Sequence, residues 1–264
     1  MTPILSPAAV SVLGELARSR ALLAFDFDGT LAPIVADRET AHPSAETRHL
    51  LRAVSLLYPC AVISGRARAD VAARVAGIPL FAVVGNHGSE AGQGPVSRTN
   101  RVQVMAWRAA LERALGDRPG IDIEDKRFSI AVHYRNVRSR GPARRSVLRA
   151  AAGLPGARVF GGHAVVNVAP CAAPDKESAL RDLLRRVGAR PVLYVGDDCT
   201  DEDVFCSSVI SVGVRVGRTG RSSARWYLPR QADIDALLRA LLAARTRADG
   251  LGDRGEGLVR AVST

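Results

Sequence analysis

The stretch Leu22-Leu23-Ala24-Phe25-Asp26-Phe27-Asp28-Gly29-Thr30-Leu31 decides the fold. Its four leading apolar residues predict a buried strand, and Gly29 allows the backbone to turn away after it. Residues i and i+2 of an extended chain face the same way, about 6–7 Å apart, so Asp26 and Asp28 should both project from the strand's carboxyl end. Two carboxylates so close repel each other unless a proton or a cation lies between them, and Mg2+ prefers oxygen ligands. The plainer alternative is an Asp-Gly turn with both acids solvated.

The same order of apolar run, polar residue and glycine recurs along the chain. Three further strands of this kind are predicted, at 59–63, 80–84 and 191–195, and they lead into Ser64-Gly65-Arg66, Gly85-Asn86-His87 and Gly196-Asp197-Asp198. Two more strands are predicted at 209–214 and 224–228. Helices are predicted between the strands, at 44–57, 67–75 and 176–187. Strands that alternate with helices imply a parallel sheet with right-handed crossovers, in which ligands bind outside the carboxyl ends of the strands.

Between residues 92 and 169 the pattern changes. Helices are predicted at 99–115 and 143–152, and paired strands at 121–125, 128–134, 158–161 and 164–168. Helix, hairpin, helix, hairpin predicts an antiparallel sheet with helices beside it. The fold class is therefore α/β, a Rossmann-like parallel core with an inserted α+β domain. The predicted boundaries are 1–91 and 170–245 for the core, 92–169 for the insert and 246–264 for a flexible tail.

Composition excludes several classes of protein. No apolar run among the 264 residues approaches the roughly 20 that span a bilayer, and no secretory signal opens the chain, so we expect a cytoplasmic protein without membrane contact. The four cysteines form no C-x-x-C pair, which argues against a zinc site or a disulfide framework. The net charge of +11 invites a nucleic-acid interpretation, but the arginines are scattered and no nucleic-acid-binding motif accompanies them. A basic surface would still help to gather phosphorylated substrates.

A second acidic cluster follows the strand at 191–195. Capping of a helix by Thr200 explains Asp203 and in part Asp201, because acids are favourable at a helix N-terminus, but it does not explain Asp197 and Asp198. If the two acid-bearing strands are neighbours, their carboxylates form a cage for one divalent ion, which is also the setting of phosphoryl chemistry. Ser64 and Lys176 are each unremarkable alone, but they lie between the two acidic clusters in chain order.

These residues resemble, in order, the four motifs of the haloacid dehalogenase superfamily of phosphotransferases. The resemblance implies that Asp26 attacks phosphorus and forms an aspartyl-phosphate, and that Asp28 protonates the leaving oxygen and then activates water. It implies that Ser64 and Lys176 hold the phosphoryl group. Mg2+ would be held by Asp26, the backbone carbonyl of Asp28 and Asp197, with Asp198 and Asp201 in support.

A finer resemblance, to the trehalose-6-phosphate phosphatase family, rests on longer runs. These are 28–34, 63–66, 85–90, Glu124-Asp125-Lys126, Ala131-Val132-His133-Tyr134-Arg135 and 196–203. In that family the insert is a cap of type C2 that covers the core and grips the disaccharide. The resemblance implies substrate contacts from Gly65, Arg66, Asn86, His87, Glu124, Lys126, Arg135 and Asn167. The alternative for the charged cap residues is a hairpin with surface charges.

The sequence departs from the family at two positions. Asn167 stands where the family has a sugar-binding Glu, and Glu177 follows Lys176 where the family has Gly. The resemblance implies a Mg2+-dependent phosphatase that releases trehalose from trehalose 6-phosphate, expected to be a monomer and open to association with a trehalose-6-phosphate synthase. The alternatives are a phosphatase for another sugar phosphate, of the sucrose or mannosylglycerate type, and a non-catalytic sugar-phosphate-binding or regulatory module.

Overall fold

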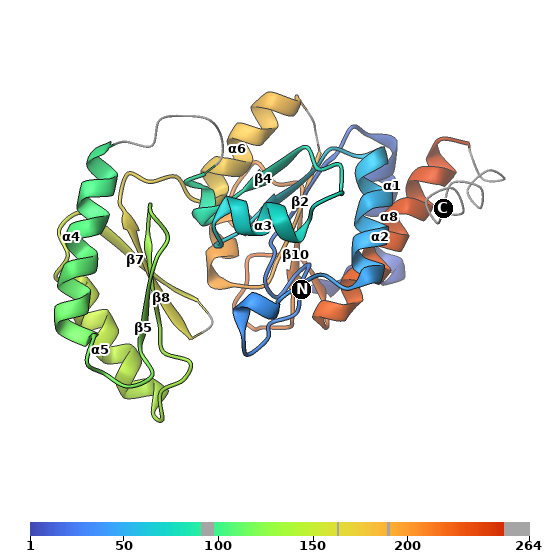
Figure 1. Ribbon diagram of the computed structural model, residues 1–264. Helices are drawn as coiled ribbons and strands as arrows, with labels where there is room; N and C mark the ends of the chain where they lie inside the picture. Colours follow the sequence, from blue (N-terminus) through green and yellow to red (C-terminus); the bar gives the residue numbers. More distant parts are fainter. Residues whose placement is uncertain (91–97, 163, 189–190, 251–264) are drawn as a thin grey trace.

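The structure is a computed structural model that describes residues 1–90, 98–162, 164–188 and 191–250 (Figure 1). Two sheets organise the chain, one of seven strands and one of four. Short 3-10 helices occur at Pro7–Ala9, Arg38–Thr40, Asn86–Gly88, Cys199–Asp201 and Gln231–Asp233. No helix in these ranges is long and apolar enough to cross a bilayer.

The larger sheet is wholly parallel, with the order β1-β11-β10-β9-β2-β3-β4. Its strands are β1 (Thr2–Pro3), β2 (Leu22–Phe25), β3 (Cys60–Ile63), β4 (Ala82–Val84), β9 (Val192–Gly196), β10 (Val212–Val216) and β11 (Trp226–Leu228). Strand β2 lies between β9 and β3, with Phe25 paired with Val195 and Val62. The residues that follow these three strands therefore meet at one edge, as the sequence predicts.

Helices cover both faces of this sheet because alternate strand residues point to opposite sides. Leu23 and Phe25 pack with α1 (Val10–Arg18), α2 (Ala45–Leu57) and α8 (Ile234–Ala248). Leu22 and Ala24 pack with α6 (Lys176–Val187) and α7 (Glu202–Phe205). Helix α3 (Arg68–Arg74) connects β3 to β4. Ser44 caps α2 by accepting a 2.9 Å hydrogen bond from the Thr47 N–H, which confirms the predicted helix start.

The smaller unit is the inserted cap, with an antiparallel sheet in the order β5-β6-β8-β7. It consists of α4 (Arg98–Leu115), β5 (Asp122–Asp125), β6 (Ile130–His133), α5 (Arg140–Ala152), β7 (Ala157–Gly162) and β8 (Val165–Pro170). Helices α4 and α5 pack on one face, against Ile130, Val132, Val166 and Val168, and they lie on the side away from the core (Figure 1). The alternate residues, among them Glu124, His133 and Asn167, line the cavity between the cap and the core.

Several element boundaries differ from the prediction. The strand expected at 209–214 is β10 at 212–216, because Val209 is a buried loop residue and apolar content alone does not separate a buried loop from a strand. Strand β1 was not predicted, since a two-residue strand that contains proline has no periodicity. Helix α8 runs to Ala248. Arg245 in its last turn donates to the carbonyl oxygens of Ala17 (2.6 Å) and Ser19 (3.1 Å). Residues 246–248 of the predicted tail are therefore helical, and residues 251–264 of it lie outside the described ranges.

Candidate active site

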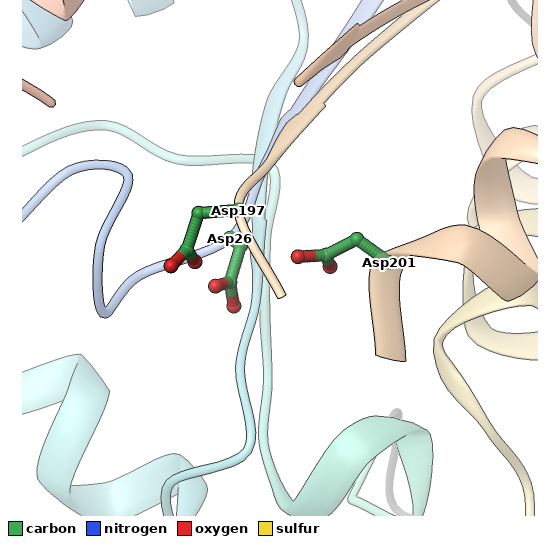
Figure 2. Close-up of side chains that lie close together, drawn as sticks. All are labelled: Asp26, Asp197 and Asp201. Carbon is green, nitrogen blue, oxygen red and sulfur yellow. The ribbon is translucent and has the colours of Figure 1, made fainter. Parts of the chain in front are cut away.

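Three carboxylates converge at the carboxyl edge of the large sheet. Asp26 follows β2, Asp197 follows β9, and Asp201 ends the 3-10 turn after it. One oxygen of each lies within 4.8 Å of the others. Figure 2 shows the carboxyl groups of Asp26 and Asp197 beside each other, with that of Asp201 directed toward them. Of the four acids inferred from sequence to form a cage, Asp26 and Asp197 belong to this cluster, whereas Asp28 and Asp198 do not.

Lys176 lies buried among these acids at the start of α6. Its Nζ donates to Asp26 Oδ1 at 2.8 Å and to Asp201 Oδ1 at 2.7 Å. Burial lowers the pKa of Lys176, but the carboxylates of Asp201 and Asp26 outweigh it and raise that pKa well above its ordinary value, so the ammonium stays charged. The buried hydroxyl of Tyr194 donates to the same Asp201 oxygen at 2.6 Å. Sequence reasoning missed Tyr194, although it is a phenol within an otherwise apolar strand.

The acids retain uncompensated negative charge despite Lys176. Burial, followed by the charges of Asp201 and Asp198, raises the pKa of Asp197 to about 7. Its Oδ1 is buried without a hydrogen-bond partner among the described residues. Burial also raises the pKa of Asp26, more than Lys176 lowers it. A cluster of oxygen atoms with excess negative charge fits a hard divalent cation.

The predicted supporting acids have other partners. Asp201 Oδ2 accepts from the Asp198 N–H at 2.9 Å, and Asp198 Oδ1 accepts from the Cys199 N–H at 2.7 Å. These two acids form a capping box on the 3-10 turn, so Asp198 rather than Thr200 is the N-cap residue. Among the five predicted metal residues, Asp26 and Asp197 are therefore the best placed to contact a cation through side-chain oxygens.

Gly29 is required by the approach of the two acidic segments. Its φ is +81°, in the region that favours glycine. A Cβ built on Gly29 would lie 2.2 Å from Asp197 Oδ2. The turn after β2 can thus pass beside the Asp197 carboxylate only without a side chain at this position.

Asp28 is paired with Arg66. The guanidinium donates to both carboxylate oxygens, at 2.7 Å from Nε and 2.8 Å from Nη2. The remaining donors of Arg66 reach Asp70 Oδ2 (3.0 Å) and the Arg38 carbonyl (2.7 Å). Arg66 lines the cavity and donates its hydrogen bonds to the protein, chiefly to the predicted proton carrier; its contact with substrate stays a prediction.

Ser64, Asn86 and His87 surround the same edge. Ser64 is 1% exposed, and its Oγ accepts from the Arg66 N–H at 3.1 Å. Asn86 and His87 both have positive φ, +48° and +53°, and both keep one buried polar atom without a partner in the described chain, Oδ1 and Nδ1. Burial, followed by the charges of Lys126, Lys176 and Arg158, lowers the pKa of His87 well below its ordinary value. A neutral imidazole and an amide thus offer hydrogen-bonding groups to a ligand.

A cavity of about 790 Å³ lies between this edge and the cap. Most of the predicted site residues line it, namely Asp26, Asp28, Gly65, Arg66, His87, Glu124, Lys126, Arg135, Asn167, Lys176, Asp197 and Asp198. Three others, Ser64, Asn86 and Asp201, are not part of the lining and lie buried. Asn167 is 4% exposed and is contributed by β8.

The tip of the β5–β6 hairpin is bonded to the core. Lys126 Nζ donates to the Gly65 carbonyl at 2.8 Å, and Asn86 Nδ2 donates to the Lys126 carbonyl at 3.0 Å. Arg135 donates to the carbonyls of Val35 and Ala36, the latter at 3.3 Å. In this arrangement the cap is closed onto the core.

Glu124 is the centre of a second contact between cap and core. Its Oε2 lies 2.9 Å from His133 Nε2, and it forms an ion pair with Arg38 of the core. Burial raises the pKa of Glu124, but His133, Lys126 and Arg38 outweigh it and lower that pKa to about 2. Sequence reasoning missed Arg38, which lies in an irregular stretch without periodicity.

The comparisons with known proteins agree with this geometry. Residues 24–218 match the family model described as Trehalose-phosphatase. The trehalose-phosphate phosphatase of Mycobacterium ulcerans (strain Agy99) is 38% identical over 215 residues, which cover 75% of this chain and 55% of the relative. The chain thus spans about half the length of the curated relatives it matches.

Solved structures share the fold. The C-terminal domain of Candida albicans trehalose-6-phosphate phosphatase superposes with a TM-score of 0.75 at 21% identity. The match covers 93% of this chain and 98% of the Candida domain. The C-terminal domain of a Candida albicans trehalose synthase regulatory protein has a TM-score of 0.63 at 14% identity, over 91% of this chain and 99% of its own. The fold is that of the haloacid dehalogenase superfamily, and the match over residues 24–218 places the chain in the trehalose-phosphatase family.

Proposed function

We propose that this protein is a Mg2+-dependent phosphatase that hydrolyses trehalose 6-phosphate through an aspartyl-phosphate on Asp26. The observation that carries the proposal is the buried Lys176, which links the carboxylates of Asp26 and Asp201 beneath a cavity roofed by polar cap residues. Burying an ammonium and several carboxylates is costly, so a purely structural role is a poor explanation for the cluster.

The first step is attack by the Asp26 carboxylate on phosphorus, with cleavage of the bond between phosphorus and the sugar oxygen. Asp28 donates its proton to the leaving oxygen in the same step. Ser64 and Lys176 hold phosphoryl oxygens, and the charged ammonium opposes the negative charge that develops on them. Asp28 then removes a proton from water, the water attacks phosphorus, and Asp26 is released together with inorganic phosphate.

Asp26, Asp197 and the backbone carbonyl of Asp28 would hold Mg2+, which would neutralise the charge on the transferring phosphoryl group. Asp201 and Asp198 would support these ligands through Lys176 and the capping box. The raised pKa of Asp197, about 7, supports this assignment, as does its buried Oδ1, which has no hydrogen-bond partner in the described part of the chain.

The cap, for which residues 92–169 remain the predicted boundaries, supplies the sugar contacts. The cavity is lined on the cap side by Glu124, Lys126, Arg135 and Asn167. On the core side it is lined by Gly65 and His87, and Asn86 lies buried next to them. Closure of the cap would exclude water while the aspartyl-phosphate forms. A monomeric state, association with a trehalose-6-phosphate synthase and a cytoplasmic location are further predictions.

Asn167 favours a second candidate substrate. It occupies the position of the family's sugar-binding Glu, and an amide bonds hydroxyl groups without the charge of an acid. Another sugar phosphate, of the sucrose or mannosylglycerate type, is therefore the alternative substrate. A non-catalytic module is disfavoured because Asp26, Asp28, Lys176 and Asp197 are all in place at one edge.

The test is phosphate release from a panel of sugar phosphates, with and without Mg2+. We expect turnover of trehalose 6-phosphate that requires Mg2+ and that Asp26→Asn abolishes. If another sugar phosphate has the higher kcat/KM, the substrate assignment is wrong while the reaction stands. If the wild type turns over none of them, the enzyme assignment itself fails.

A further inference from the structure

Arg215 on β10 contacts the backbone of the loop that follows β9 and carries Asp197 and Asp198. Its Nη2 donates to the Asp197 carbonyl at 2.6 Å, and its Nη1 lies 3.3 Å from the Asp198 carbonyl. Nη1 also donates to Glu202 Oε1 at 2.7 Å. In the parallel pairing of β9 with β10, Arg215 lies opposite Gly196, so the strand register places the guanidinium beside the residues that leave the sheet edge.

We propose that Arg215 is a positioning residue for the divalent-cation site, acting through the backbone of Asp197 and Asp198. It does not line the cavity, and its hydrogen bonds go to peptide carbonyls rather than to the acidic side chains that face the cavity. Holding both carbonyls away from the cavity fixes the two peptide planes and therefore the direction in which the Asp197 carboxylate projects.

The guanidinium is itself held in place. Glu202 accepts from Arg215 with one oxygen and from the Ser223 N–H with the other, at 2.9 Å. Only 16% of the Arg215 side chain is exposed. Arginine suits this position because its planar group reaches several acceptors at once, whereas the single ammonium of lysine cannot match their fixed geometry. Partners of this kind that lie behind a metal ligand commonly change metal affinity by 10–100-fold.

The inference rests on the proposed function only in requiring a cation at Asp197. Calorimetric titration with Mg2+ alone, without substrate, tests it on wild type, Arg215→Gln and Arg215→Lys. We expect the Kd for Mg2+ to rise about tenfold or more in Arg215→Gln and by less in Arg215→Lys. Arg239→Gln is the matched control, because Arg239 pairs with Glu46 on the far helices α8 and α2, and its Kd should equal that of the wild type.

Circular dichroism of the Mg2+-free variants separates positioning from loss of fold. If Arg215→Gln is folded and binds Mg2+ within twofold of the wild type, Arg215 has no positioning role. If Arg215→Gln does not fold, Arg215→Lys decides, and unchanged Mg2+ affinity in that variant overturns the inference. If the wild type binds no Mg2+, both this inference and the metal assignment of the proposed function fail. If the wild type binds Mg2+ and the variants bind it equally well, only this inference fails.

Discussion

At the scale of single residues, the pairing of Arg66 with Asp28 has a consequence for proton transfer. If Arg66 orients the proton carrier, Arg66→Lys should slow the release of the sugar in a single turnover by about 10–100-fold, because general acid catalysis contributes that much or more. The release of nitrophenolate from p-nitrophenyl phosphate in a single turnover should slow much less, since nitrophenolate leaves without a proton and the later activation of water by Asp28 does not enter this measurement. Arg74→Lys is the control, because Arg74 also pairs with Asp70 (2.7 Å) but does not contact Asp28. Equal slowing of leaving-group release from both substrates would contradict the role.

Site residues that lie within a sequence motif could be predicted from the sequence. Site residues whose role depends on a contact with a distant part of the chain could not. Asp26 and Asp197 follow from their places at strand ends, whereas Lys176 was singled out by its order between the two acidic clusters and by the resemblance to the superfamily. Tyr194 and Arg215 carry no such signal, because their partners are a carboxylate seven residues on and carbonyl groups in the loop that follows the neighbouring strand. Arg66 was found by its motif, but its contact with Asp28 depends on the approach of two separate loops.

At the scale of elements, the turn after β2 depends on the absence of a side chain at Gly29. Gly29→Ala should impose both backbone strain and a clash with the Asp197 carboxylate, since the new Cβ would lie 2.2 Å from it. Gly77→Ala is a close control, because its φ of +82° matches the +81° of Gly29 while nothing lies within 4 Å of its Cβ position. The backbone strain should cost each variant about 1 kcal/mol of stability, and the clash should make the loss in Gly29→Ala the larger of the two.

Only Gly29→Ala should also lose the rise in melting temperature that Mg2+ gives the wild type, because Asp197 must move. Thermal unfolding with and without Mg2+ measures both effects. If Mg2+ raises the melting temperature of Gly29→Ala as much as that of the wild type, the turn at Gly29 does not affect how Asp197 binds the cation.

The boundaries of helices and strands were predicted closely where capping or turn residues mark them. Where such residues are lacking, the predicted boundaries differ from those of the structure. Ser44 marks the start of α2 by its side-chain cap, and the apolar run 22–25 is β2 itself. The capping signal at Thr200 was wrong because Asp198 accepts the Cys199 N–H and occupies that role two residues earlier. Short polar side chains close together in sequence compete for one cap, and the sequence does not rank them.

At the scale of the whole molecule, the insertion of a cap between two halves of the core was readable from the change of pattern at residues 92–169. The closed arrangement was not, because it depends on contacts such as that between Arg38 and Glu124, which are far apart in the chain. The cap closes through charged and polar groups: Lys126 and Arg135 reach core carbonyls, and Glu124 meets Arg38. Polar contacts of this kind suit a cap that opens to release product.

The lowered pKa of Glu124 makes the stability of the folded protein sensitive to acid, through His133 and Lys126 of the cap and Arg38 of the core. Its pKa is about 2 in the folded protein and near its ordinary 4.5 when unfolded, so its stabilisation is complete above about pH 5 and is lost as the pH falls toward 2. Between pH 5.5 and 3.5 the free energy of unfolding of the wild type should fall by about 1 kcal/mol more than that of Glu124→Gln, which has no proton to bind. Urea unfolding at both pH values measures the difference. Glu112→Gln, in an exposed pair with Arg108 on α4, should lose as much as the wild type. Equal pH dependence of the wild type and Glu124→Gln would mean that the contacts of this carboxylate do not stabilise the folded protein.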